Sequence, residues 1–160
     1  MADLPRHFDE PEDAYYGFFK ADAAQDAEAW AAVMSYPHVR VAAQGRVAYF
    51  ETPAEFAERG PDWKDRVKTG WAYTRGRESE HWHVSDNRVL LVGGWTRFNK
   101  QDEPILHNRI TYILTRPGGT WGIQSRFAVG AWDGGDDSAE ADEAAAIAVD
   151  MRAVPDGFVG

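Results

Sequence analysis

The sequence contains no cysteine and no long apolar run, and each absence excludes a class of protein. Without cysteine the chain has no disulfides, no thiolate metal ligands and no cysteine nucleophile. No stretch approaches the roughly 18 consecutive apolar residues of a membrane-spanning helix, and the N-terminal residues lack the apolar core of a signal peptide. We therefore expect a soluble, cytoplasmic protein with no membrane partner.

Basic residues are also scarce, with 17 Lys and Arg against 26 Asp and Glu and a formal net charge of -9. A nucleic-acid-binding surface needs Lys and Arg to replace the counterions of the phosphates, so we expect no nucleic-acid partner. Eight of the acids lie at or after Asp133, where Arg152 is the only basic residue. The acidity is therefore concentrated at the C-terminal end of the sequence.

The chain has the length and composition of one globular domain. Its 160 residues are 44% hydrophobic and 13% aromatic, including seven Trp, which is enough for one core or for the walls of an apolar pocket. We predict an N-terminal extension over 1–12, a folded domain over 13–132 and an acidic tail over 133–160. The tail includes an Ala-rich stretch over 139–151 that we expect to form a short helix.

Hydrophobic spacing places helices in the first half of the domain. It predicts a long helix over 14–34 that breaks near 25–26 and stops before Pro37. Thr52-Pro53-Ala54-Glu55 is a capping box that starts a second helix, and a third is expected over 62–69.

Strands dominate the second half of the domain. The expected strands are 38–42, 47–50, 80–85, 88–98, 105–116 and 120–129. The last four are joined by short breaks, which predicts an antiparallel meander. Helices followed by a long sheet indicate a single α+β domain with the helices against one face of the sheet.

Several segments resemble the nuclear transport factor 2-like superfamily and, within it, the SnoaL-like group. They are Tyr15-Tyr16-Gly-Phe-Phe, Tyr36-Pro37-His38-Val39-Arg40, Gly94-Trp95-Thr96-Arg97-Phe98 and the final hairpin. The resemblance implies a cystatin-like cone, in which a curved antiparallel sheet wraps round the long N-terminal helix and leaves a cavity at the wide end. It also implies a homodimer through the outer sheet, and enzymes similar to it act without a cofactor.

Strand alternation indicates which polar residues of the final hairpin face the cavity. A turn at 117–119 pairs Leu114 with Trp121, Tyr112 with Ile123, Ile110 with Ser125 and Asn108 with Phe127. Asn108, Tyr112 and Ser125 are therefore candidate ligand-binding residues, or else polar groups hydrogen-bonded within the core. The opposite set should face outward: Arg109, Thr111, Gln124 and Arg126.

His81 is the first candidate for acid–base chemistry. It shares a strand face with His83, but a metal site needs further ligands that the sequence does not supply, so we expect no metal. Imidazole exchanges protons near neutral pH, and the resemblance places His81 at a catalytic histidine of scytalone dehydratases. An ordinary strand histidine is the alternative.

A second comparison, with ketosteroid isomerases, places their oxyanion tyrosine at Tyr16 and their carboxylate base at Ala42, which cannot accept a proton. His38 and Arg40 share a strand face with Ala42, so either could replace it as a base or as an anion-binding group. The alternative for His38 is simple packing beside Pro37.

The register of the strand over 88–98 decides the role of Arg97. If Trp95 faces the cavity, Arg97 does too, and it must then be paired or bind an anionic ligand; a slip by one residue would leave it solvated. Trp71 and Trp95 could form the wall of an aromatic pocket, although such residues are often plain core.

Two functional hypotheses follow. The first is a cofactor-independent acid–base enzyme, a lyase, dehydratase or isomerase, including retro-aldol C–C cleavage, acting on a small aromatic or alicyclic molecule. In it His81 and His38 would move protons, while Tyr16, Arg97 or Arg40 would stabilise the developing anion. The alternative is a non-catalytic module of the same fold that binds a small molecule or dimerises.

Overall fold

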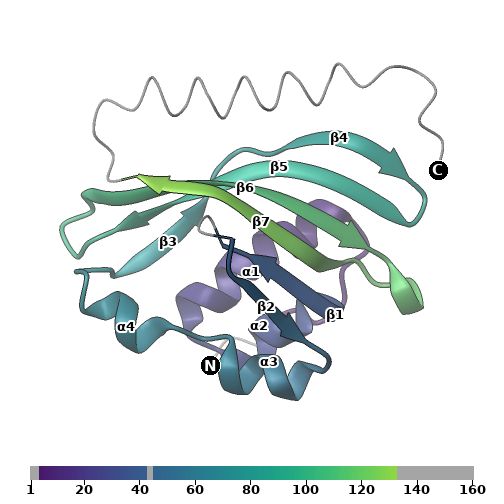
Figure 1. Cartoon of the computed structure of the whole chain (residues 1–160), viewed down its shortest axis with the longest axis horizontal. Coiled ribbons are helices and arrows are strands. Elements are labelled where there is room, and N and C mark those ends of the chain that lie inside the picture. Colours follow the sequence, from purple (N-terminus) through teal and green to yellow (C-terminus); the bar gives the residue numbers. More distant parts are fainter. Residues whose placement is uncertain (1–3, 43–44, 133–160) are drawn as a thin grey trace.

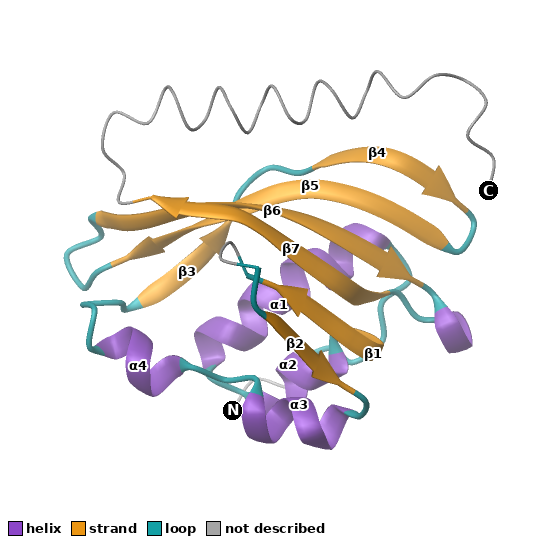
Figure 2. Cartoon of the chain, in the orientation of Figure 1, coloured by secondary structure: helices purple, strands orange, loops and turns teal. Residues whose placement is uncertain are grey.

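The structure is a computed structural model and describes residues 4–42 and 45–132. Its helices are α1 (Pro11–Ala24), α2 (Ala27–Ala32), α3 (Pro53–Arg59), α4 (Trp63–Val67) and the short 3-10 helix η1 (Pro117–Gly119). Its strands are β1 (Met34–Val41), β2 (Val47–Phe50), β3 (Tyr73–Gly76), β4 (Glu80–Ser85), β5 (Arg88–Phe98), β6 (Pro104–Thr115) and β7 (Gly122–Trp132). The helices lie on one side of the sheet (Figure 2), as the α+β prediction requires.

Within the described residues, the strands form one seven-stranded sheet in the order β2-β1-β7-β6-β5-β3, with β4 pairing to β5 as well. Neighbouring strands are antiparallel except β1 and β7, which run parallel. The sheet is curved and unclosed, and α1 lies under its concave face (Figure 1). No helix in the described part of the chain is long and apolar enough to cross a membrane.

The N-terminal helix differs from the prediction at its C-terminal end. It divides into α1 and α2 at the predicted break, because Gln25 adopts a left-handed conformation and the Asp26 side chain then accepts a hydrogen bond from the Ala29 amide, capping α2. Met34 lies in β1 and not in the helix, since β1 begins before Pro37. The prediction also omitted β3, a strand of four residues.

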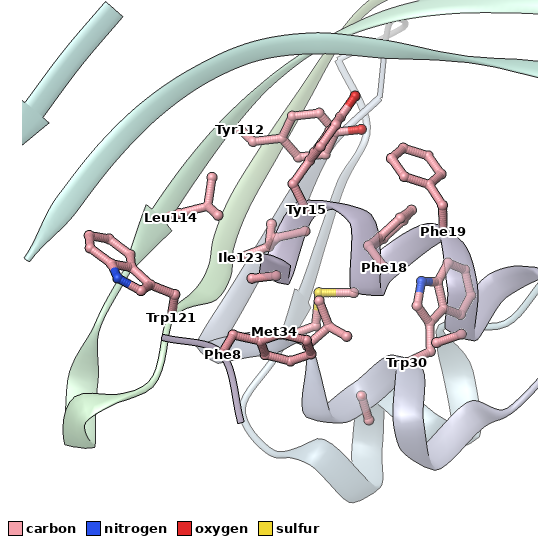
Figure 3. Close-up of a cluster of buried hydrophobic side chains, with 14 of the residues drawn as sticks. Phe8, Tyr15, Phe18, Phe19, Trp30, Met34, Tyr112, Leu114, Trp121 and Ile123 are labelled. Carbon is pink, nitrogen blue, oxygen red and sulfur yellow. The ribbon is translucent and has the colours of Figure 1, made fainter. Parts of the chain in front are cut away.

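Aromatic side chains join α1 to the concave face of the sheet (Figure 3). Phe18 lies 5.2 Å from Trp30, and Tyr15 lies 5.3 Å from Tyr112, between ring centroids. All four are buried, and Ile123 from β7 completes the contact with the sheet. This core fixes which side of each strand faces the interior.

A register shift in the final hairpin overturns the predicted pairing. Leu114 lies opposite Ile123, but Tyr112 lies opposite Arg126 and Ile110 opposite Ala128. One shift falls between Ile113 and Leu114, where β7 has one extra residue, so the side chains of residues 125–128 change face before a second shift between Arg109 and Ile110.

The predicted orientations on β7 are therefore wrong at three positions. Arg126, expected outside, lies on the concave face, whereas Ser125 and Phe127, expected inside, alternate to the convex face. Phe127 is 38% exposed. The predicted helix over 139–151 lies outside the described residues.

Candidate functional site

A row of side chains crosses the concave face of the sheet. Tyr112 on β6 pairs with Arg126 on β7, Arg126 with Arg40 on β1, and Arg40 with Ala48 on β2. Residues directly opposite on neighbouring strands point to the same side of a sheet. Two arginines therefore stand next to each other on the face that looks toward the helices.

A pocket of about 420 Å³ opens beside these arginines. It is lined by Arg40, Val41, Ala42, Arg46, Val47, Ala48, Arg126 and Ala128. Ala42, Ala48 and Ala128 share the face of Arg40 and Arg126, and their small side chains leave the space that larger residues would fill. We call this hollow the mouth pocket, and its volume lies in the range of small-molecule sites.

Deeper in the cone, Arg66 of α4 is paired with two carboxylates. Its Nη1 donates to both carboxylate oxygens of Asp22, at 2.7 and 2.8 Å, and its Nη2 lies 2.5 Å from Asp62. The indole nitrogen of Trp63 also donates to Asp22, at 2.8 Å. Burial alone would lower the pKa of the Arg66 guanidinium, but the hydrogen bond to Asp62 and the charge of Asp22 outweigh it and raise that pKa.

The two arginines of the mouth pocket have no such partners. Neither Arg40 nor Arg126 forms an ion pair with any described residue, and Arg40 stacks instead over Phe56, 4.6 Å from the ring centroid. Burial and the charge of Arg126 lower the pKa of the Arg40 guanidinium well below its usual value. The charges of Asp62 and Asp22 oppose this shift from a distance, but no described carboxylate forms an ion pair with either arginine.

His38 holds Arg40 in place. It is fully buried, and its Nδ1 lies 2.8 Å from the Ile123 carbonyl oxygen, which can only accept, so the proton is on Nδ1. Nε2 then accepts from Arg40 Nε at 3.2 Å. Burial, with the charge of Arg40, lowers the pKa of His38 to about 3, so this histidine is neutral at physiological pH and its free lone pair is already used.

The two tryptophans and Arg97 lie on the concave side. Trp95 is buried, and the Arg97 guanidinium lies over its ring at 4.7 Å and 3.9 Å from Asp62. Burial, followed by the charge of Arg66, lowers the pKa of Arg97 to about 10. Trp71 is buried and donates to Thr74 Oγ1 at 2.8 Å, so it belongs to the packed end of the cone.

Asn108 and Tyr112 are buried on the concave face, Asn108 opposite Trp95 and Tyr112 opposite Arg126. Neither the Asn108 Oδ1 nor the Tyr112 hydroxyl has a hydrogen-bond partner among the described residues. Burial raises the pKa of the Tyr112 hydroxyl to about 12. Ser125 does not join them because of the register shift.

His81 and Tyr16 are not brought to this site. His81 pairs with Leu91, and its Nε2 lies 3.1 Å from a carboxylate oxygen of Glu12 at the start of α1. Its strand, β4, lies four strand spacings from the strand of Arg40, β1, which is roughly 19 Å across the sheet. Tyr16 is 43% exposed. Its neighbour Tyr15 is the buried tyrosine, and its hydroxyl donates to the Gly94 carbonyl at 2.9 Å.

Sequence reasoning missed Asp22, Asp62, Arg66 and Arg126. Asp22 and Arg66 lie in helices and Asp62 at the N-cap of α4, where one ionisable residue in a polar stretch gives no sign of burial. The sequence pattern placed Arg126 on the outward face, and the register shift in β7 brings it to the concave face. No group of metal-ligating side chains occurs among residues 4–42 and 45–132.

Comparison with known proteins identifies the fold. No protein-family profile and no curated protein matches the chain. Among solved structures, it is similar to a domain of unknown function with a cystatin-like fold from Nostoc punctiforme, with 19% identity, a TM-score of 0.56, and coverage of 87% of this chain and 91% of that one. An NTF-2-like protein of unknown function from Shewanella oneidensis MR-1 gives 15% identity, a TM-score of 0.56, and coverage of 73% and 93%.

A ketosteroid isomerase-like protein from Erwinia carotovora atroseptica is similar at 17% identity and a TM-score of 0.55, over 74% of this chain and 91% of that one. The chain is thus an α+β protein with a curved, unclosed sheet and a cystatin-like architecture. Its fold is that of the nuclear transport factor 2-like proteins, which confirms the resemblance seen in the sequence.

Proposed function

We propose that this chain is a small-molecule-binding protein whose ligand occupies the mouth pocket. The observation behind the proposal is the hollow floored by Ala42, Ala48 and Ala128 beside Arg40 and Arg126. Three small side chains on one face leave space that a purely structural cone would fill, because protein interiors are close-packed. A pocket with apolar lining and a few convergent polar groups is the usual form of a small-molecule site.

Acid–base catalysis on a small aromatic or alicyclic molecule, the first hypothesis from the sequence, receives less support. His38 is the histidine nearest the mouth pocket, and both of its nitrogens are engaged. His81 lies several strands away, and Asp22 is occupied by Arg66 and Trp63. A general base needs a free lone pair within reach of the substrate proton, and the candidates named here do not offer one.

The test is a thermal-shift screen of small aromatic and alicyclic molecules, followed by mass spectrometry of the recovered ligand. We expect hits that raise the melting temperature and are recovered unchanged. Ala48→Phe should fill the mouth pocket and weaken binding at least tenfold. Tyr49→Trp, on the same strand with its side chain on the opposite face, is the matched control and should bind normally.

Two results would contradict the proposal. If Ala48→Phe binds as tightly as the parent, the ligand lies elsewhere. If the recovered ligand is chemically converted, the catalytic hypothesis replaces simple binding.

Homodimerisation through the outer sheet is a further part of this proposal. The convex face of β1, β2 and β7 exposes Tyr49 and Phe127, which form an apolar surface with Val39. Light scattering after gel filtration tests it, and a monomer at micromolar concentration would exclude it.

A further inference from the structure

The charged residues inside the cone do not balance. Among the described residues four arginines lie there, Arg40, Arg66, Arg97 and Arg126, against Asp22 and Asp62. Both carboxylates form their ion pairs with Arg66 or Arg97, and neither forms one with Arg40 or Arg126. Burying unpaired charge is costly, so the two remaining positive charges call for an anion.

The unpartnered hydrogen-bonding atoms are also mostly donors. Among the described residues, the buried side-chain atoms without a partner are Trp30 Nε1, Arg40 Nη2, Arg66 Nε, Arg97 Nε, Asn108 Oδ1 and the Tyr112 hydroxyl. Five of the six can donate and only Asn108 Oδ1 is purely an acceptor. Buried polar atoms normally find partners, so the interior is short of acceptors.

We propose that the ligand of the mouth pocket is an organic carboxylate whose anionic end lies against Arg40 and Arg126. This inference rests on the proposed function and adds the chemical class of the ligand. A planar guanidinium matches a carboxylate in a two-pronged hydrogen bond, which favours arginine over lysine in such a site. The alanines of the pocket would contact the apolar body of the same molecule.

The space behind the mouth pocket limits how far into the protein the anionic group can reach. Arg126 also lines a small void with Arg97, Asp22 and Phe18, and that void measures only about 20 Å³. It has room for about one water molecule, so it does not admit a carboxylate with its carbon body. The anionic end therefore stops at the pair Arg40 and Arg126, at the inner wall of the mouth pocket.

His38 is the positioning residue of this site. Its Nε2 accepts from Arg40 Nε and leaves the two terminal nitrogens of Arg40 free of any hydrogen bond to a described side chain. One of them, Nη2, is buried without a partner. His38 thereby fixes the plane of the guanidinium before any ligand binds, which reduces the entropy lost on binding.

The experiment compares carboxylates with their carboxamides in the wild-type full chain. A panel of aryl and alicyclic acids, 2-naphthoate among them, is titrated beside the matching amides by isothermal calorimetry. We expect each acid that binds to bind at least tenfold more tightly than its amide. Amides that bind equally well would overturn the carboxylate assignment while leaving the binding function intact.

Arg126→Gln tests the residue. It should abolish the preference for acid over amide, and the ligand-free variant should melt at an unchanged or higher temperature, because the repulsion with Arg40 is removed. Arg109→Gln, on the outward face of β6, is the matched control and should keep the preference. A retained preference in Arg126→Gln would overturn the assignment, and Arg126→Met, which also removes the charge, replaces it should that variant fail to fold.

Two further outcomes separate the two proposals. If neither acids nor amides bind at any concentration tested, the proposed binding function fails and the inference fails with it. If inorganic phosphate binds as tightly as the best acid and displaces it, the site recognises a bare anion and the organic carboxylate class is wrong.

Discussion

Two arginines of the same cone, Arg66 and Arg126, have opposite surroundings. Arg66 is buried between Asp22 and Asp62, and every contact it makes serves the fold. Arg126 lines the same small void as Arg66, and its guanidinium lies over the ring of Phe18. It stands opposite Arg40 on the neighbouring strand and forms no ion pair with a described carboxylate. The first arginine is held in ion pairs within the core, and the second lines the mouth pocket without a paired carboxylate.

The difference separates structural charge from functional charge. A buried ion pair with satisfied geometry is at most neutral for stability, but removing one member leaves an uncompensated charge. An arginine held beside a second positive charge without a paired carboxylate, as Arg126 is beside Arg40, opposes folding in the free protein. Such strain is common at binding sites, because the ligand supplies the missing partner. The comparison therefore predicts opposite responses to mutation at the two ends.

The largest effect is expected for Asp22→Asn. The substitution keeps the shape of the side chain but removes the charge that balances Arg66, so unfolding free energy should fall by about 3–5 kcal/mol. Urea denaturation measures it. Asp65→Asn is the matched control on an exposed pair with Lys68 and should stay within error of the parent. If Asp22→Asn costs no more than Asp65→Asn, the narrow end is not held by this pair.

A smaller effect is expected from acid, through His38. Its folded pKa of about 3 lies below the unfolded value near 6.5, so the unfolded chain binds the extra proton first. Stability is therefore complete above pH 6.5 and falls as pH drops toward 3, by about 2 kcal/mol between pH 7 and pH 5. Urea denaturation at a series of pH values measures this slope.

His38→Gln should remove the slope between pH 7 and pH 5, since no imidazole remains to be protonated there. His7→Gln, at an exposed position, should keep it. A parent protein whose stability is flat over this range would contradict the assignment of His38 as a buried neutral side chain.

The sequence predicted the fold because the fold depends on extended patterns. The strands over 80–85 and 88–98 and the capped helix at Thr52 follow from alternation and capping chemistry, and the structure has all three. The break at Gln25 was also visible, because Asp26 is a capping residue. Patterns of this kind average over many residues, so one irregularity does not hide them.

The site could be predicted only in part because it depends on single residues. One extra residue in β7 exchanged Arg126 for Ser125 on the concave face, and no local signal announces such a bulge. Strand alternation predicts that Arg97 faces inward if Trp95 does, and the structure has both side chains on the concave side. Tyr16 and Tyr15 are adjacent in the helix, and a shift of about 100° between neighbours decided which one is buried.

The smallest effects distinguish two buried tyrosines whose rings lie 5.3 Å apart. The Tyr15 hydroxyl is 2.9 Å from the carbonyl oxygens of both Gly94 and Arg77, so Tyr15→Phe should lower the unfolding free energy by about 1 kcal/mol. The Tyr112 hydroxyl has no partner among the described residues, so Tyr112→Phe should leave stability unchanged or slightly higher. Thermal denaturation of both variants beside the parent measures the contrast. Equal losses would mean that the Tyr112 hydroxyl is already satisfied in the free protein, and the wide end would then be less short of acceptors than its unpaired donors indicate.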